Sequence, residues 1–580
     1  MLAGRYLRLG LAVLLLIPGL GMAEAESPAV AFGKGQQWSR PLAMAVATAH
    51  ADATDAGLAI MAAGGNAFDA AVTISAVLAV VEPYSSGIGG GGFWLLHQAA
   101  TGKNVMVDGR ERAPLAAQPD LYLDEDGELI AGASLNGPLA AGIPGEPAAL
   151  VHLAEHYGRL PLATTLAPAI RLAREGFAVD EIYRRMAAWR LEVLRASPAA
   201  ASQFLVDGEV PALGALIRQP DLAAVLEALA AKGRAGFYEG AVARALVTGT
   251  RAAGGIWTLE DLSSYQVVER DPIVGRYQGW EILSAAPPSS GGVALVQMLG
   301  MLEALDARLG PASGEADRVH RLVEVMRRAY RDRARYLGDP DQVEIPVERL
   351  TNPDYAAGLA RDIDPARATP SIARAMAPEG RDTTHFSVLD ADGNRVAATL
   401  SINYPFGSGF VPPTTGVLLN DEMDDFSTQP GVPNVYGLVG GEANAIAPGK
   451  RMLSSMSPTF AATEDQLVIL GTPGGSRIIT MVLQGILAAI QGGDPQDWVA
   501  APRFHHQYLP DQIRFEAAAF DDALQHQLSE RGHHLAPADQ RYGNMQLIVW
   551  DRTSGIVQAA SDPRGIGKAS VRKQPAALEP

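Results

Sequence analysis

Hydroxyl side chains gather at one point of the chain, where a connector gives way to a strand. The run Asp382-Thr383-Thr384-His385-Phe386-Ser387 follows a Pro-, Ala- and Arg-rich stretch, 364–382, whose composition is typical of an exposed connector. The chain has no cysteine, so a side-chain nucleophile must be oxygen or nitrogen. Threonine is also common in strands because its branched side chain fits a pleated surface, so this run alone does not establish chemistry.

A glycine pair marks a second place where chemistry is possible. Gly474 and Gly475 lie between a strand expected over 467–470 and a helix expected over 476–490. Acyl transfer builds negative charge on an oxygen atom, and two adjacent backbone N–H groups near the positive end of a helix dipole can hold that charge. The same pattern also fits an ordinary tight turn.

Two further motifs raise the question of a cofactor. Gly87 to Gly92 satisfies G-x-G-x-x-G, with Asp108 downstream, but 93–96 continues as a strand rather than as the helix that a dinucleotide site needs. The pairs His505-His506 and His533-His534 could suggest zinc, yet no His-Glu-x-x-His pattern occurs. We therefore expect structural histidines, no metal and no cofactor.

Hydrophobic patterns predict the elements that must position these groups. Helices are predicted over 53–63, 67–81, 146–157, 163–175, 221–232, 237–249, 292–306 and 316–336. Strands are predicted over 280–285, 383–390, 395–402, 546–551 and 555–560, in addition to 467–470. The strands at 383–390 and 395–402 flank an Asp-Gly turn, which is a strong hairpin signal. The mixture predicts a sheet covered by helices.

Length, charge and the N-terminal segment define the class of protein. A chain of 580 residues can form two or three domains or one large layered body, and a net charge of −17 argues against nucleic-acid binding. Arg5 and Arg8, an apolar run over 9–20 and Ala23-Glu24-Ala25 predict a cleaved export signal over residues 1–25. An uncleaved anchor is the alternative, but the run is shorter than the roughly 20 residues of a membrane span. The mature protein is expected in the periplasm or the medium, without an anchor.

Six motifs follow one another along the chain in a fixed order. They are Asp108-Gly109-Arg110-Glu111, Pro287-Pro288-Ser289-Ser290-Gly291-Gly292, Thr383-Thr384-His385, Asn420 to Phe426, Ser454-Ser455-Met456-Ser457-Pro458 and Gly471 to Arg477. In this order they resemble the γ-glutamyltranspeptidase (glutathione hydrolase) family of N-terminal nucleophile hydrolases. The resemblance implies an α+β fold, specifically a four-layer αββα sandwich built from two chains after self-cleavage.

The same resemblance implies how the chain is processed and what carries the reaction. Cleavage between Asp382 and Thr383 would leave a large subunit, 26–382, and a small subunit, 383–580, paired as a heterodimer. Thr383 would then be the nucleophile, because a terminal threonine carries its own α-amine, which titrates near 7.7–8.0 and can accept the hydroxyl proton. Ser401 stands where the family usually has a threonine that orients this amine, and Gly474 with Gly475 matches the family's oxyanion glycines.

A γ-glutamyl donor carries a free α-carboxylate and a free α-ammonium, so its pocket needs a cation beside acids. By resemblance, Arg110 binds the carboxylate through its planar fork. The residues expected to assist are Ser454 and Ser455 for the carboxylate, and Asn403, Glu422 and Asp425 for the ammonium. Asp424 is expected to be an ordinary solvated surface residue.

The stretch 430–450 resembles the lid loop of one branch of the family, with Tyr436 as its gate, although a Gly/Pro-rich loop with one aromatic can also merely cap a core. The expected function is γ-glutamyl transfer from glutathione and other γ-glutamyl compounds to water or to an amino acid or peptide acceptor. Related cephalosporin (glutaryl) acylases generally lack this lid and form the nearest alternative. An exported γ-glutamyl-binding or glutamate-binding protein without turnover is another.

Overall fold

The computed structural model describes residues 39–371, 383–429 and 431–573 of the chain. The predicted export signal, Asp382 and most of the predicted connector lie outside the described residues. Within the described part, no helix is both long enough and apolar enough to cross a membrane.

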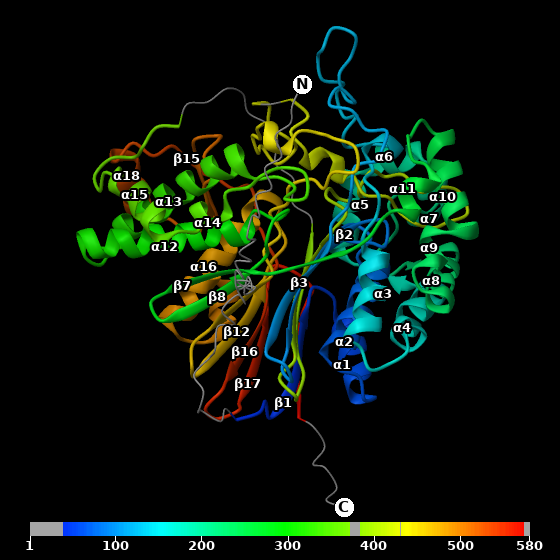
Figure 1. Cartoon of the computed structure of the whole chain (residues 1–580), viewed down its shortest axis with the longest axis horizontal. Coiled ribbons are helices and arrows are strands. Elements are labelled where there is room, and N and C mark those ends of the chain that lie inside the picture. The colour runs from blue at the N-terminus through cyan, green and yellow to red at the C-terminus, as the bar shows by residue number, and fades with distance from the viewer. Residues whose placement is uncertain (1–38, 372–382, 430, 574–580) are drawn as a thin grey trace, which may run out of the picture. The chain divides into compact units, whose positions relative to one another are not determined.

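Two antiparallel sheets form the centre of the fold (Figure 1). The seven-stranded sheet has the order β18 (Lys568–Lys573), β1 (Ala43–Thr48), β9 (Thr384–Leu389), β10 (Arg395–Ser401), β2 (Gly91–Gln98), β3 (Lys103–Gly109) and β6 (Val268–Arg270). The six-stranded sheet has the order β17 (Val557–Ser561), β16 (Gln546–Asp551), β12 (Gln466–Gly471), β11 (Thr459–Ala462), β8 (Trp280–Ser284) and β7 (Ile273–Tyr277). Smaller sheets pair β13 (Phe504–His505), β14 (Ile513–Phe515) and β15 (Leu535–Pro537), and β4 (Phe177–Ala178) with β5 (Leu216–Ile217).

Successive side chains of a strand point to opposite faces of the sheet, so every second residue faces the other sheet. In β1, Ala43, Ala45 and Ala47 belong to one apolar cluster together with residues of the six-stranded sheet such as Phe460 and Ile469. The small alanines leave room for these larger side chains, so the two inner faces pack directly on each other. Met44 and Val46 point the other way, into the core beneath the helices.

Apolar helices cover the outer faces of the sheets. The helices α1 (Ala51–Ala62) and α2 (Ala67–Val81) pack on the seven-stranded sheet, while α12 (Gly291–Leu309) and α16 (Ile478–Gln491) pack on the six-stranded one (Figure 1). Every residue of α2 is buried, and Asn66 caps it by accepting from the N–H groups of Phe68 and Asp69. The protein is therefore an α+β protein.

The remaining helices surround this centre. They are α3 (Glu146–His156), α4 (Leu162–Glu175), α5 (Glu181–Trp189), α6 (Leu191–Ala196), α7 (Pro198–Phe204), α8 (Pro220–Lys232), α9 (Ala235–Tyr238), α10 (Gly240–Ala252), α11 (Leu259–Ser263), α13 (Glu315–Tyr336), α14 (Val347–Leu350), α15 (Pro353–Arg361), α17 (Pro495–Ala500) and α18 (Asp522–Glu530). Short 3₁₀ turns occur at η1 (Pro138–Ala140), η2 (Glu422–Asp425), η3 (Glu442–Asn444) and η4 (Gly475–Arg477).

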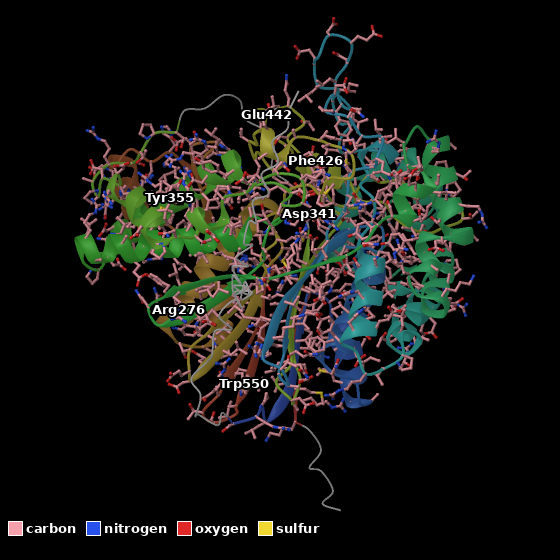
Figure 2. All side chains as sticks on the ribbon, viewed as in Figure 1. Arg276, Asp341, Tyr355, Phe426, Glu442 and Trp550 are labelled. Carbon is pink, nitrogen blue, oxygen red and sulfur yellow. The ribbon has the colours of Figure 1, made fainter. Side chains whose placement is uncertain are left out.

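The predicted elements are confirmed with small shifts at their ends, apart from one helix. The helix predicted over 237–249 is wrong as a single element, because the chain breaks at Gly240, whose φ of 66° is left-handed, and forms α9 and α10 instead. Figure 2 shows Phe426, which follows η2, and Trp550, on β16, toward opposite ends of the sheets. The candidate site lies at the Phe426 end.

Candidate active site

The hairpin of β9 and β10 places Thr383 beside Ser401. Its register pairs Leu389 with Arg395 and Thr384 with Leu400, so the next pair would be Thr383 with Ser401. The Thr383 Oγ1 and Ser401 Oγ atoms lie 3.4 Å apart, and both residues are buried. The predicted position of Thr383 at the start of a strand is therefore confirmed.

The neighbours of this hydroxyl pair are held by their own hydrogen bonds. Ser401 Oγ accepts from the N–H of Asn403 at 2.8 Å, and Thr384 Oγ1 donates to Glu82 at 2.8 Å. Asn403 has a φ of 73°, which residues other than glycine rarely adopt and which often occurs at functional sites. Its side-chain amide donates to the carbonyl of Asp421 at 3.0 Å.

The glycine pair occurs where β12 ends and α16 is about to begin. Gly474 has a φ of 141° and Gly475 a φ of 57°, and glycine adopts such positive φ values without the steric cost that a side chain would add. Both line cavities that Thr383 also lines, Gly474 on one side and Gly475 on the other. A Cβ added to Gly475 would collide with the ring of Tyr436, so this turn needs glycine for close approach as well.

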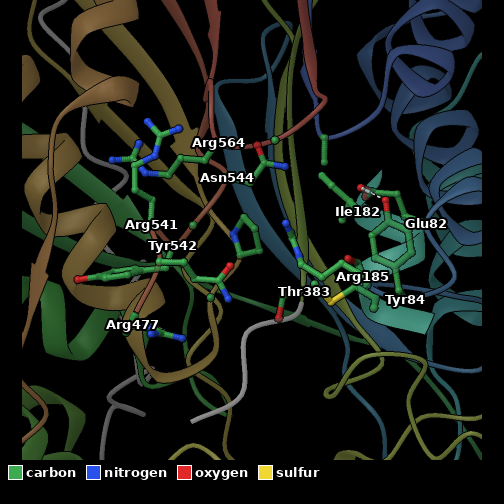
Figure 3. A pocket seen from close by; sticks show the side chains of 18 of the residues that line it. Glu82, Tyr84, Ile182, Arg185, Thr383, Arg477, Arg541, Tyr542, Asn544 and Arg564 are labelled. Carbon is green, nitrogen blue, oxygen red and sulfur yellow. Dashed lines mark hydrogen bonds between the residues drawn. The ribbon is translucent and has the colours of Figure 1, made fainter. Parts of the chain in front are cut away.

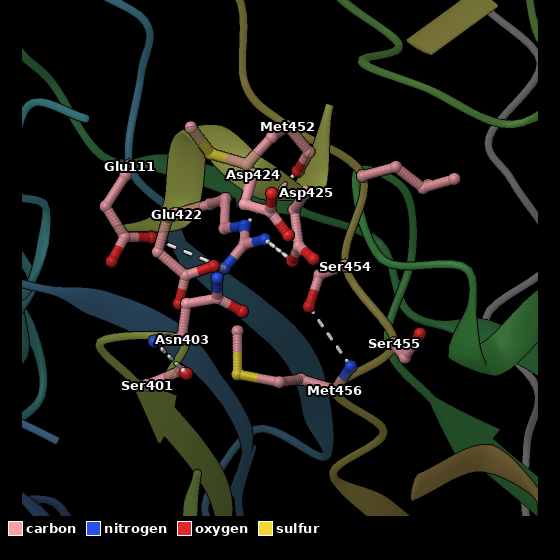
Figure 4. A network of polar contacts seen from close by, with 12 residues as sticks. Glu111, Ser401, Asn403, Glu422, Asp424, Asp425, Met452, Ser454, Ser455 and Met456 are labelled. Atoms are coloured by element: carbon pink, nitrogen blue, oxygen red, sulfur yellow. Dashed lines mark hydrogen bonds and ion pairs between the residues drawn. The ribbon is translucent and has the colours of Figure 1, made fainter. Parts of the chain in front are cut away.

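A buried arginine and three acids form the polar centre of the pocket (Figure 4). Arg110 donates to Glu422 at 2.5 Å, to Asp425 at 2.5 Å and to the carbonyl of Met452 at 3.2 Å. Glu111 lies 3.5 Å from the same guanidinium and is fully buried. One buried cation thus faces two buried carboxyl groups, on Glu111 and Glu422, and a third, on Asp425, that is 12% exposed.

Burial governs the protonation of these acids. It raises the pKa of Glu422 to about 7, against the opposing effect of Arg110, while the charge of Asp425 adds to the rise. Burial also raises the pKa of Glu111 well above its ordinary value, and the neighbouring Glu422 adds to this. The cluster therefore retains a proton more readily than exposed carboxylates would.

The motif from Pro287 to Gly292, which had no role from sequence, supports the serine pair. The N–H of Ser454 donates to the carbonyl of Pro288 at 2.8 Å, and Ser290 Oγ donates to the carbonyl of Ser454 at 2.7 Å. Arg333, from α13, donates to both Ser290 Oγ at 2.9 Å and Ser455 Oγ at 3.2 Å. Ser454 and Ser455 are held at the wall of the cavity that Arg110 also lines.

The segment that resembles a lid closes this cavity. Tyr436 is buried, and its hydroxyl donates to the carbonyl of Asn403 at 2.7 Å. The expectation for Asp424 was wrong, because it is buried and accepts from Ser134 Oγ at 2.7 Å and from the N–H of Val435 at 3.0 Å. Burial raises the pKa of Asp424 to about 6. This carboxyl group holds the loop in place, because it accepts from a backbone N–H of the loop that needs an acceptor.

Thr383 lines two cavities of very different size. The cavity on the Arg110 side measures about 20 Å³, which is room for about one water molecule. Its lining includes Ser401, Asn403, Glu422, Asp425, Tyr436, Ser454, Ser455 and Gly475. On the other side a cavity of about 420 Å³ opens between α5, the turn at Gly474 and the segment before β16 (Figure 3). The structure thus brings all the predicted side chains to one place, around Thr383.

The two motifs that suggested cofactors are part of the scaffold. Gly89 and Gly90 pack directly on the backbone of Leu418 and Ser401, and the strand predicted after them is confirmed as β2. His505 contacts Thr480 and Gln507 at 2.8 Å each, and burial lowers its pKa to about 3. Among the described residues, no group of three or more His, Asp or Glu side chains is arranged so that it could hold a metal ion.

Comparison with known proteins agrees with this geometry. The family described as Gamma-glutamyltranspeptidase matches residues 53–572. The chain is 41% identical over 554 residues to "Glutathione hydrolase proenzyme" of Escherichia coli (strain K12), covering 94% of this chain and 95% of that protein. It is 44% identical over 503 residues to the protein of the same description from Pseudomonas sp. (strain A14), covering 85% and 86%.

A solved structure supports the fold. The cephalosporin acylase from Bacillus halodurans matches with a TM-score of 0.79 at 28% identity, covering 94% of this chain and 99% of that one. In class, the chain is thus an α+β protein of the N-terminal nucleophile hydrolase type. It belongs to the gamma-glutamyltranspeptidase family.

Sequence reasoning missed three side chains of the site. Arg333 lies on α13 and Glu82 directly follows the last residue of α2, and both runs only suggested amphipathic or buried packing. Glu111 was part of a recognised motif but received no role of its own. The available signal was their charge, since buried charged residues need a partner and therefore indicate a polar site inside a core.

Proposed function

We propose that this chain is a self-processing γ-glutamyl transferase and hydrolase, which passes the γ-glutamyl group of glutathione and related compounds through an ester on Thr383. The acceptor is water or the amine of an amino acid or peptide. One observation carries the proposal: Thr383 Oγ1 lies beside Ser401, and a cavity lined by Arg110, Glu422 and Asp425 adjoins it. No cofactor takes part in this reaction.

Self-cleavage supplies the base. Thr383 Oγ attacks the carbonyl carbon of Asp382, the peptide C–N bond breaks and an ester forms, which water then hydrolyses. The products are a carboxylate on Asp382 and a free α-amine on Thr383. That amine accepts the hydroxyl proton when Thr383 next attacks a donor, because its pKa of about 7.7–8.0 leaves a neutral fraction near neutral pH.

The two fragments, 26–382 and 383–580, remain one body as a heterodimer. The seven-stranded sheet supports this, because β9 and β10 of the small fragment pair with β1 and β2 of the large fragment. Cleavage before Thr383 leaves both ladders intact. In this assembly the helices and the two sheets are the four layers of an αββα sandwich.

The donor occupies the Arg110 side of Thr383. Arg110 binds its α-carboxylate with Ser454 and Ser455, while Asn403, Glu422 and Asp425 receive its α-ammonium. Arg110 is paired with both acids, so the donor's own charges replace contacts that already exist. Gly474 and Gly475 direct backbone N–H groups at the developing oxyanion, and Tyr436 gates entry.

A glutaryl acylase is the second candidate, because the cephalosporin acylase of Bacillus halodurans shares the fold over nearly the whole chain. A glutaryl group has the terminal carboxylate but no ammonium, so it would leave Glu422 and Asp425 without a counter-ion. The cluster of acids around Arg110 favours the γ-glutamyl donor. The predicted export signal over residues 1–25 favours the periplasm or the medium as the place where the enzyme acts.

A direct comparison of two substrates tests the proposal. The purified protein is given γ-glutamyl-p-nitroanilide or glutaryl-p-nitroanilide, and Thr383→Ala is compared with Thr164→Ala, an exposed threonine on α4. We expect release of nitroaniline from the γ-glutamyl substrate by the wild type and Thr164→Ala, but not by Thr383→Ala. An active Thr383→Ala variant would remove this residue from the mechanism, and a preference for the glutaryl substrate would favour the acylase.

A further inference from the structure

We propose that Arg333 is a positioning residue for the α-carboxylate of the donor, because one guanidinium holds both Ser290 and Ser455 and leaves the hydroxyls of Ser454 and Ser455 free to donate. This inference rests on the proposed function. It gives α13 a part in substrate selectivity, since the contacts of Arg333 make this wall of the cavity suitable for a carboxylate and less suitable for an uncharged amide.

The position of Arg333 on its helix is the first argument. Arg333 and Arg335 both lie in the last turn of α13, where the helix dipole favours a cation. Arg335 is exposed, as this effect alone would allow, whereas Arg333 is buried. Burial of an arginine is costly unless its charge and its N–H groups are used. The dipole therefore does not account for the buried position of Arg333.

The direction of the hydrogen bonds is the second argument. A guanidinium can only donate, so each hydroxyl that it contacts must accept. Arg333 donates from Nε to Ser290 Oγ at 2.9 Å and from Nη2 to Ser455 Oγ at 3.2 Å. Ser290 Oγ gives its own hydrogen to the carbonyl of Ser454 at 2.7 Å. The first contact thus fixes the backbone of Ser454, and the second occupies the accepting side of Ser455.

The two serine hydroxyls keep their hydrogens for the cavity. Ser455 Oγ has no other partner in the part of the chain that the structure describes. Ser454 Oγ accepts from the N–H of Met456 at 3.1 Å (Figure 4). Both serines line the cavity that Arg110 lines. Because a carboxylate only accepts, it matches two such donors, whereas the NH₂ group of an amide would face them with hydrogens of its own.

The charge of Arg333 is the third argument. Arg110 is paired with Glu422 and Asp425, but no described carboxylate lies within ion-pair distance of Arg333. Burial lowers the pKa of Arg333, although Tyr330 and Asp425 oppose this effect. An arginine stays protonated in proteins, so a buried positive charge remains without an adjacent counter-ion. The α-carboxylate of the donor supplies that counter-ion when it reaches the serines.

Two donors that differ in one group test the inference. They are γ-glutamyl-p-nitroanilide and the same anilide with its α-carboxylate replaced by a carboxamide, and the ratio of their kcat/KM values measures the selectivity. The enzymes are the wild type, Arg333→Met, Arg333→Lys, Ser455→Ala and the double variant of Arg333→Met with Ser455→Ala. Arg335→Met is the control, because it removes an exposed arginine from the same helical turn that lines neither cavity.

We expect Arg333→Met to lower the selectivity about tenfold, through a higher KM for the carboxylate donor, while kcat changes less than about twofold. In the Ser455→Ala background the same substitution should change the selectivity less than about threefold, because Arg333 acts through this hydroxyl. The control should match the wild type. Unchanged selectivity in Arg333→Met, or an equally large effect in the Ser455→Ala background, would overturn the proposal.

Arg333→Lys carries the test if Arg333→Met yields no processed protein. An ammonium keeps the charge but lacks the planar fork that reaches both hydroxyls, so the selectivity should fall at least about threefold. Wild-type selectivity in Arg333→Lys would then overturn the proposal. A wild type that releases no nitroaniline from either donor would instead overturn the proposed function, so the two failures are distinguishable.

Discussion

Replacing Arg110 by methionine tests the polar centre of the site in a way that activity alone does not. Methionine keeps most of the length of the side chain but removes the cation that faces Glu111, Glu422 and Asp425. Arg110 and Glu422 each have only 1% of the side chain exposed, so the acids left behind gain almost no water. Removing one partner of such a buried pair costs about 3–5 kcal/mol of unfolding free energy.

The loss should depend on pH with a definite sign. Burial already raises the pKa of Glu422 to about 7 and that of Glu111 well above its usual range, although Arg110 opposes both shifts. Without Arg110 these pKa values rise further. A carboxyl group with a raised pKa in the folded state destabilises the fold as pH increases above its unfolded pKa, because the unfolded chain ionises first. The variant should therefore lose more stability at pH 8.5 than at pH 6.

Urea unfolding at pH 6 and pH 8.5 measures the free energy of unfolding of the wild type and of Arg110→Met. Arg171→Met is the surface control, and Arg110→Lys is a variant that keeps the charge. The KM for a γ-glutamyl donor should also rise at least about tenfold in Arg110→Met, since a charge-assisted contact is lost. A variant that loses less than about 1 kcal/mol, or equal amounts at both pH values, would refute the picture of a buried arginine neutralising three acids. An unchanged donor KM would refute its role in binding.

Three further predictions concern the lid, the acids and the hydroxyl pair. Gly475→Ala should raise the donor KM, because its Cβ displaces Tyr436, whereas Gly449→Ala, with a left-handed φ of 68° but no close contact of this kind, should not; equal effects would contradict the lid contact. The donor kcat/KM should increase as pH rises through about 7, where Glu422 ionises, and Glu422→Gln should leave only the rise near 7.7–8.0 that the α-amine of Thr383 gives; a pH profile that is the same in the wild type and the variant would exclude Glu422. Ser401→Ala should lower kcat about tenfold or more, with Ser401→Thr restoring it, because Ser401 lies 3.4 Å from Thr383 Oγ1; a fall in donor affinity alone would reassign Ser401 to binding.

The local parts of the site could be predicted from the sequence because they depend on short-range rules. The Asp-Gly turn fixes the register of β9 and β10, and this register alone sets Thr383 beside Ser401. The positive φ values of Gly474 and Gly475 likewise follow from a strand that must turn into a helix within a few residues.

Contacts between residues that are far apart in the chain could not be predicted from the sequence. In the sequence, Asp424 cannot be distinguished from a surface acid. Its burial depends on contacts with Ser134 and with the loop at Val435, and tertiary packing forms both contacts. Arg333 reaches Ser455 across more than a hundred positions of the chain, so no local pattern indicates the contact. The large cavity could not be predicted from the sequence either, because α5, the turn at Gly474 and the segment before β16 meet only in the folded protein.

The most direct test of the account is intact mass spectrometry of a purified sample, combined with a γ-glutamyl-p-nitroanilide assay on the same sample. The account predicts that activity appears together with a fragment that begins at Thr383 and ends at Pro580, and that both are missing in Thr383→Ala. Turnover of the anilide by a preparation in which the bond between Asp382 and Thr383 is still intact would contradict it.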